Sequence, residues 1–183
     1  MRIISGSFRG RMIHPPKNFK ARPTTDFAKE SLFNIINNNF DYSDIKALDL
    51  FSGTGSISYE LASRGSSDIV SVELNYNHFA FIKKTAAELK FSQIKTVRAD
   101  VFKFLKTCNR TFNIIFADPP YDLDNIESIP NIIFEKGLLE SEGWLIMEHG
   151  SRTDFSTHTN FKEQRVYGSV NFSIFEITKN SKN

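Results

Sequence analysis

The sequence predicts an α/β fold: a mostly parallel seven-stranded sheet that ends in a C-terminal antiparallel hairpin. Three observations predict it. From residue 45 onward, short apolar runs typical of strands alternate with longer segments typical of helices. Strands joined in this way pair in parallel and carry helices on both faces of the sheet. Two β-rich runs then follow one another across Gly168-Ser169, which is the spacing of a tight hairpin.

The individual elements are placed by apolar pattern and by turn residues. We expect parallel strands at 45–51, 69–74, 94–99, 112–117 and 144–148, and hairpin strands at 163–167 and 170–178. We expect helices between them at 56–64, 76–90, 101–107 and 126–136. Before the first strand, Thr24 or Thr25 caps a helix with a mostly apolar face made of Phe27, Leu32, Phe33, Ile35 and Ile36.

The N-terminal stretch differs in character from the rest of the chain. We expect residues 1–40 to form a small extension, a β-hairpin followed by a helix, and residues 41–183 to form the main domain. No acidic residue precedes Asp26, and the stretch carries six cations: Arg2, Arg9, Arg11, Lys17, Lys20 and Arg22. Such an arm can attract the phosphates of a nucleic acid, although a merely solvated tail has the same composition. We expect a variant without residues 1–20 to fold.

Composition sets outer limits on the class of protein. A chain of 183 residues with 40% hydrophobic residues suits one globular domain with a full core. No apolar run approaches the roughly 20 residues that span a bilayer, and the start of the chain lacks a signal-peptide layout. A single cysteine, Cys108, excludes an intramolecular disulfide, and no cluster of metal ligands stands out. We therefore expect a cytoplasmic protein without a membrane or metal partner.

The first strand runs into a loop whose residues favour a cofactor with a cationic group. Open α/β sheets bind ligands at the carboxyl ends of their strands, and glycines there let the backbone approach closely. Here the run from Asp49 through Phe51 ends in Gly53-Thr54-Gly55. A nicotinamide-binding loop has a third glycine where this chain has Ser58. Asp49 can instead oppose the ammonium group of a methionine moiety, which favours S-adenosylmethionine.

Two further strand ends supply candidate cofactor contacts. Glu73 ends the second strand 20 residues after Gly53, the spacing at which an acidic side chain reaches ribose hydroxyls. Asp100 follows the third strand and can accept a hydrogen bond from the adenine amino group, while Val101 or Phe102 packs on the ring. Asp100 can equally cap the helix that follows, and the two roles are compatible.

The fourth strand ends in the most specific motif of the chain, Asp118-Pro119-Pro120-Tyr121. Prolines have no backbone N–H, so the loop is stiff and offers acceptors: the Asp118 carboxylate and free carbonyls. The lone pair of an exocyclic base amine is delocalised into the ring. Acceptors that bind the N–H groups of this amine orient the lone pair toward a methyl donor. Tyr121 offers a ring on which the base can stack. These four residues are the predicted catalytic residues, and methylation of a nucleobase amine is the predicted reaction.

These motifs together resemble the bacterial 16S ribosomal RNA guanine-N2 methyltransferases of the guanine-966 type, over nearly the whole chain. The most family-specific stretch is Arg22-Pro23-Thr24-Thr25-Asp26 with Lys29-Glu30-Ser31-Leu32-Phe33-Asn34. The resemblance implies a Rossmann-like class I methyltransferase fold, S-adenosylmethionine as cofactor, and a guanine in 16S rRNA or a small-subunit assembly particle as substrate. Two positions depart from the family: Phe27 replaces a usual arginine, and Ser58 replaces a common glycine.

Three other functions remain open at this stage. A DNA adenine-N6 or cytosine-N4 methyltransferase would use the same catalytic loop, although a domain of this size has no obvious segment for recognising a DNA sequence. A catalytically silent, cofactor-binding RNA-binding module is opposed by the intact Asp118–Tyr121 loop. A nicotinamide oxidoreductase is opposed by Asp49 and Ser58.

Overall fold

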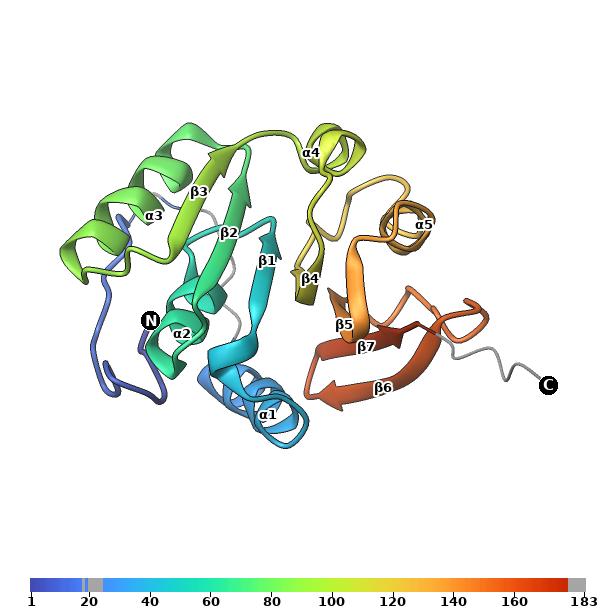
Figure 1. The fold of residues 1–183 in the computed structure, drawn as a ribbon, viewed down its shortest axis with the longest axis horizontal. Helices are drawn as coiled ribbons and strands as arrows, with labels where there is room; N and C mark the ends of the chain where they lie inside the picture. The colour runs from blue at the N-terminus through green and yellow to red at the C-terminus, as the bar shows by residue number, and fades with distance from the viewer. Residues whose placement is uncertain (18, 20–24, 178–183) are drawn as a thin grey trace.

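The structure is a computed structural model that describes residues 1–17, 19 and 25–177. Its helices and strands follow the predicted alternation (Figure 1). The helices are α1 (Asp26–Asn37), the 3₁₀ turn η1 (Tyr42–Asp44), α2 (Ser56–Arg64), α3 (Tyr76–Glu88), α4 (Val101–Thr107) and α5 (Ser128–Glu135). The strands are β1 (Lys46–Leu50), β2 (Asp68–Glu73), β3 (Ile94–Arg98), β4 (Phe112–Ala117), β5 (Leu139–His149), β6 (Phe161–Tyr167) and β7 (Val170–Glu176).

The seven strands form one sheet in the order β3-β2-β1-β4-β5-β7-β6. The pairs from β3 through to β5 are parallel, and β7 pairs antiparallel with both β5 and β6. The predicted fold class, a mostly parallel sheet with a C-terminal antiparallel hairpin, is confirmed. The strand order reverses between β1 and β4, which creates a topological switch point at their carboxyl ends.

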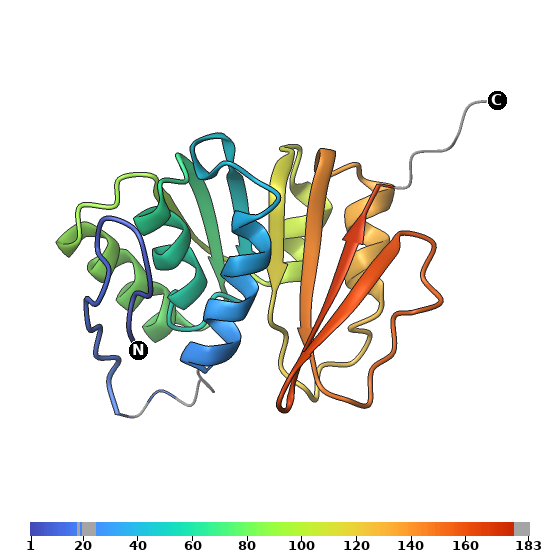
Figure 2. The same ribbon diagram turned by 90° about the horizontal axis from the view of Figure 1, so that it is seen from below.

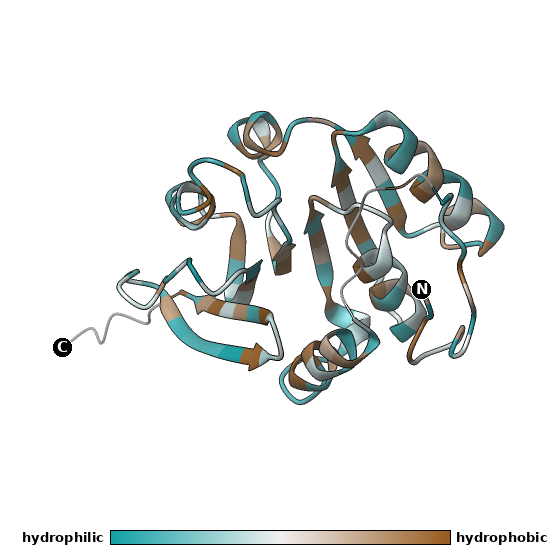
Figure 3. Cartoon of the chain, turned by 180° about the vertical axis from the view of Figure 1, so that it is seen from behind, coloured by the Kyte–Doolittle hydropathy of each residue, from teal (hydrophilic) through white to brown (hydrophobic). Residues whose placement is uncertain are grey.

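Two apolar cores fill the space between the sheet and its helices. One joins α1, α2 and α3 to the sheet and includes Leu32, Phe33, Tyr59, Phe116 and Phe172. The other lies under α4 and α5 on the opposite face. In Figure 3 the central strands are mainly apolar, whereas the helices turn polar residues outward. Helices therefore cover both faces, as parallel strands require.

One residue of the expected apolar face of α1 lies elsewhere. Thr25 caps this helix, because its hydroxyl accepts the Ala28 N–H at 3.1 Å. Leu32, Phe33 and Ile36 are buried as predicted, but the Phe27 side chain is 68% exposed. The place expected for Phe27 is taken by Ala28 and by the aliphatic stem of Lys29, both of which are buried.

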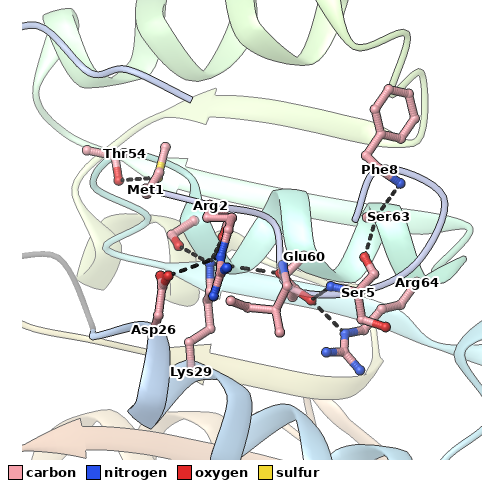
Figure 4. Close-up of polar contacts among 12 residues, drawn as sticks. Met1, Arg2, Ser5, Phe8, Asp26, Lys29, Thr54, Glu60, Ser63 and Arg64 are labelled. Atoms are coloured by element: carbon pink, nitrogen blue, oxygen red, sulfur yellow. Dashed lines mark hydrogen bonds and ion pairs between the residues drawn. The ribbon is translucent and has the colours of Figure 1, made fainter. Parts of the chain in front are cut away.

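The N-terminal segment, residues 1–17, packs against α2 as an integral part of the fold. The predicted hairpin is present as a single bridge between Arg2 and Met12, and Ile3 and Ile13 are buried in the core. The buried Glu60 carboxylate accepts the backbone N–H groups of Ile4 at 2.7 Å and Ser5 at 3.0 Å (Figure 4). These contacts argue against the expectation that residues 1–20 are dispensable for folding, because their removal takes two donors from a buried carboxylate.

No helix within the described residues is long and apolar enough to cross a membrane.

Candidate active site

The predicted cofactor and catalytic residues meet at one edge of the sheet. Parallel strands end at the same edge, and Glu73, Asp100 and Asp118 each stand at or just after the end of a strand in the block β3-β2-β1-β4. The Asp118 N–H donates to the Leu50 carbonyl at 3.4 Å, so the catalytic loop starts directly beside the glycine-rich loop. This shared edge is the lower one in Figure 2, where the N-terminus of α1 and the β6–β7 turn also lie.

The glycine-rich loop follows β1 through a backbone that few residues adopt. Phe51, Gly53 and Gly55 all have positive φ, at 57°, 54° and 80°. A Cβ on Gly55 would lie 2.8 Å from the Tyr59 ring, so the close approach of loop and helix requires glycine there. Phe51 has no such freedom, and a strained non-glycine residue of this kind is found mostly at functional sites. The loop presents its backbone to the space above β1 and the start of α2.

Asp49 lies beneath this loop and is 1% exposed. Its carboxylate accepts the Ser58 hydroxyl at 2.5 Å and the Ser58 N–H at 3.2 Å. Burial raises the pKa of Asp49 to about 7, against the opposing effect of the Ser58 hydrogen bonds. Ser58 stands where the family commonly has a glycine. Its hydroxyl and N–H thus donate to Asp49, the carboxylate that is predicted to contact the cofactor. Contact between Asp49 and an ammonium group stays a prediction.

Glu73 stands at the end of β2 and reaches across to the glycine-rich loop. Its Oε2 accepts the Gly53 N–H at 2.8 Å, and its Oε1 accepts the Asn75 N–H at 2.7 Å. A carboxylate has about four acceptor positions, so these two bonds leave capacity for ribose hydroxyls. Glu73 therefore has a structural partner in the loop in addition to the predicted cofactor contact.

Asp100 caps α4, since its Oδ1 accepts the Lys103 N–H at 3.0 Å. Val101 is 3% exposed within the core under α4, so it can support a bound ring only from below. Leu74 was not predicted as a site residue, yet its side chain is 59% exposed directly after Glu73. An apolar side chain at the carboxyl end of β2 suits the flat face of an adenine. Sequence pattern could not single it out, because apolar residues at strand ends are usually buried.

The catalytic loop adopts a turn after β4. Pro119 is buried and half-buried Asp118 precedes it, whereas Tyr121 is 46% exposed. The Pro120 carbonyl accepts the Leu123 N–H at 3.0 Å. That carbonyl closes the turn, which occupies one of its two lone pairs, so the expected acceptor role of the loop carbonyls stays a prediction. The loop still brings a carboxylate and an exposed aromatic ring to the edge that holds the glycine-rich loop.

Two of the basic residues of the N-terminal segment lie away from this edge. Arg9 and Arg11 are exposed, but the turn that carries them packs on the C-terminal end of α2, where Ser7 N–H donates to the Ser63 carbonyl at 2.7 Å. The glycine-rich loop lies at the other end of this nine-residue helix, about 13 Å away. Arg2 pairs with Asp26 at 3.3 Å, and Lys17 is exposed. Lys20 and Arg22 lie outside the described residues.

Two contacts tie the N-terminal segment to the glycine-rich loop, and sequence reasoning did not predict either. Buried Lys29 donates from Nζ to the Arg2 carbonyl at 2.6 Å and to the Ser56 hydroxyl at 3.2 Å. The Thr54 hydroxyl donates to the Met1 sulfur at 3.3 Å (Figure 4). Among the described residues no group of three or more His, Cys, Asp or Glu side chains could hold a metal ion.

Comparison with known proteins places this arrangement in a family. The model of the family described as "Conserved hypothetical protein 95" matches residues 1–176. "Putative rRNA methyltransferase YlbH" of Bacillus subtilis is 30% identical, with 96% of this chain and 98% of the relative covered. "Ribosomal RNA small subunit methyltransferase D" of Escherichia coli is 28% identical over 96% of this chain and 89% of the relative. The solved structure of yhhF from Escherichia coli is 28% identical and covers 96% of both chains, with a TM-score of 0.83.

Proposed function

The chain belongs to the family described as "Conserved hypothetical protein 95", and we propose that it is an S-adenosylmethionine-dependent rRNA methyltransferase. Two of the relatives compared above are named as rRNA methyltransferases. Its substrate is the exocyclic N2 amine of a guanine in 16S ribosomal RNA. This RNA is either free in the cytoplasm or part of a small-subunit assembly particle there. The observation that carries the proposal is the start of the Asp118–Tyr121 loop beside the glycine-rich loop, at the switch point of the sheet.

The residues at this edge fit the proposed cofactor. The left-handed backbone at Gly53 and Gly55 allows close approach of a ligand, and Glu73 has acceptor capacity toward ribose hydroxyls. Exposed Leu74 offers an apolar contact for the adenine. Asp49 places a carboxyl group below the loop, where it favours a cation. S-adenosylmethionine supplies an activated methyl group and a neutral thioether as leaving group.

The catalytic loop then has to hold a poor nucleophile in line with the methyl carbon. The Asp118 carboxylate accepts an N–H of the guanine amine and so holds its lone pair out of the ring plane. Tyr121 stacks on the base and fixes its orientation. Bound S-adenosylmethionine would supply the methyl carbon to the amine nitrogen as its carbon–sulfur bond broke, and the extra proton on nitrogen would then leave to solvent. Catalysis of this kind depends on positioning and on preorganised acceptors.

The test is transfer of radiolabelled methyl groups to rRNA stripped of this modification, with DNA as a second substrate. We expect label in small-subunit rRNA and in the N2-methylguanine fraction after nuclease digestion. Asp118→Ala should remove at least two orders of magnitude of single-turnover rate, because one preorganised acceptor is lost. It should leave cofactor affinity nearly unchanged. Label in DNA alone, or a fully active Asp118→Ala variant, would contradict the proposal.

A further inference from the structure

An aromatic pair, Phe27 and Tyr167, stands at the same edge of the sheet as the catalytic loop and has no role in the site described above. The rings lie 6.1 Å apart between centroids with planes at 79°. Tyr167 is half-buried and its ring is 6.0 Å from that of Phe172, which anchors it to the sheet. Phe27 is 68% exposed, so one face of the pair is open to solvent.

Strand register places the pair level with the catalytic loop. Ala117 pairs with Met147, and Glu148, the next residue of β5, pairs with Phe172. The Tyr167–Val170 pair lies two residues from Phe172 toward the start of β7, so it reaches the level of the Pro119–Pro120 turn. β6 is three strands from β4, which corresponds to about 14 Å. α1 contacts β6, and Figure 2 shows the N-terminus of α1 near the β6–β7 turn.

Core packing gives no reason for an aromatic side chain at position 27. The core contacts of α1 are made by Leu32, Phe33 and Ile36, and removal of an exposed ring creates no cavity. Seven large apolar side chains among the described residues are exposed, and those at this edge include Phe27, Tyr76 and Tyr121, with Leu74 and Val166. An edge that gathers exposed rings beside a catalytic loop favours a ligand with flat faces.

A guanidinium group lies close to the pair. Arg2 is half exposed and its Nε lies 3.3 Å from Asp26, the residue next to Phe27, so the other guanidinium N–H groups can donate to a phosphate there. Unpaired RNA bases are recognised by stacking on aromatic side chains while cations contact the phosphates. An exposed ring beside an arginine also occurs at protein interfaces, so we favour RNA because the pair shares its edge of the sheet with the proposed catalytic loop.

We propose that the aromatic pair is a stacking site for an unpaired base of the RNA substrate, a neighbour of the base that enters the catalytic loop. The proposal rests on the proposed rRNA methyltransferase function. The β4 and β6 backbones are about 14 Å apart, so we assign different bases of one RNA strand to Tyr121 and to the aromatic pair. The pair therefore positions the strand, and the catalytic loop selects the amine.

The test compares Phe27→Ala, Phe27→Leu and Phe27→Trp with the wild-type chain in binding and methylation of unmodified small-subunit rRNA. Phe27→Ala should raise KM for RNA by about 5- to 150-fold, which corresponds to roughly 1–3 kcal/mol. Phe27→Trp should keep the wild-type KM for RNA because it retains an aromatic ring. Phe27→Leu should raise this KM because it does not. The slope of log affinity against log salt should stay unchanged in all three variants, because no phosphate contact is removed.

Val166→Ala is the matched control, because Val166 is 60% exposed and neighbouring side chains of a strand point to opposite faces. It should leave KM for RNA unchanged, and no variant should alter cofactor affinity. Loss of the edge contact between Phe27 and Tyr167 should lower the melting temperature only slightly, so all variants are compared well below it. A wild-type chain that does not methylate RNA would overturn the proposed function and this proposal with it. An active wild-type chain with an unchanged KM in Phe27→Ala, or full rescue by leucine, would overturn the stacking site alone.

Discussion

Replacement of Glu60 by alanine should release the N-terminal segment from the core. The Glu60 carboxylate is fully buried and accepts three hydrogen bonds, from Ile4 N–H, Ser5 N–H and, at 2.8 Å, Arg64 Nε. It also lies 3.8 Å from Lys29 Nζ, which is 2% exposed. The substitution leaves Lys29 as a buried cation without its counter-ion and leaves two backbone donors without an acceptor (Figure 4).

The size of the effect follows from the loss of one partner of a buried ion pair, which costs about 3–5 kcal/mol. For a chain of this length, 2–4 °C per kcal/mol gives a fall in Tm of about 6–20 °C. Burial lowers the pKa of Lys29, and Glu60 opposes that shift. Without Glu60 the folded-state pKa of Lys29 falls further below its unfolded value of 10.5. The folded state then binds fewer protons, so the variant should recover stability as pH rises toward that value.

Urea and thermal unfolding at pH 7 and at about pH 9 would measure both effects, with hydrogen exchange of the Ile4 and Ser5 amides as a local readout. Glu60→Gln is the matched control: it keeps one acceptor oxygen and should lose less stability. Equal stability of wild type and Glu60→Ala, or a deficit that grows with pH, would refute the role assigned to this carboxylate.

Three further predictions concern ligands. Glu73→Ala should weaken cofactor binding by about 10- to 150-fold, the equivalent of a charge-assisted hydrogen bond worth roughly 1.5–3 kcal/mol, and unchanged affinity in calorimetry would place the ribose elsewhere. Because burial raises the pKa of Asp49 to about 7, its carboxylate is protonated as pH falls from about 7 to 5.5, so affinity for the cationic cofactor should fall over this window. Asp49→Asn should make cofactor affinity nearly independent of pH over this window. Equally flat pH profiles for the wild type and the variant would contradict the contact between Asp49 and the cofactor. Arg9→Ala with Arg11→Ala should lower the salt slope of RNA binding by about 0.7–0.9 per lost phosphate contact, and identical slopes would leave that turn without a role in RNA binding.

Local sequence signals predicted most of the elements because each signal acts within a few residues. The bounds of α2, α4 and β4 agree with those predicted, since Gly65 ends the first and Asp100 caps the second. β5 starts at Leu139, five residues before the predicted strand. Polar residues fill its first half, the register shifts opposite Phe112, and Glu142 adopts φ of 65°. An irregular strand of this kind has no alternating pattern to detect.

The site itself was predicted in its residue types but not in their partners. The motifs placed Asp49 and Glu73 at strand ends, but only the fold shows that Ser58 donates to the first and Gly53 to the second. A buried charge such as Lys29 is harder still to predict, because in a sequence it resembles any exposed lysine of an amphipathic helix.

The contacts that sequence could not provide change how the N-terminal segment must be studied. Lys29 Nζ donates hydrogen bonds to both the Arg2 carbonyl and the Ser56 hydroxyl, so one ammonium group links the segment to the start of α2. Deletion of the segment would disturb the core, the glycine-rich loop and any RNA contact at once. Loss of methylation in such a variant would therefore say nothing about RNA. Substitutions at exposed Arg9 and Arg11 separate these effects, because the turn that carries them lies at the far end of α2 from the loop.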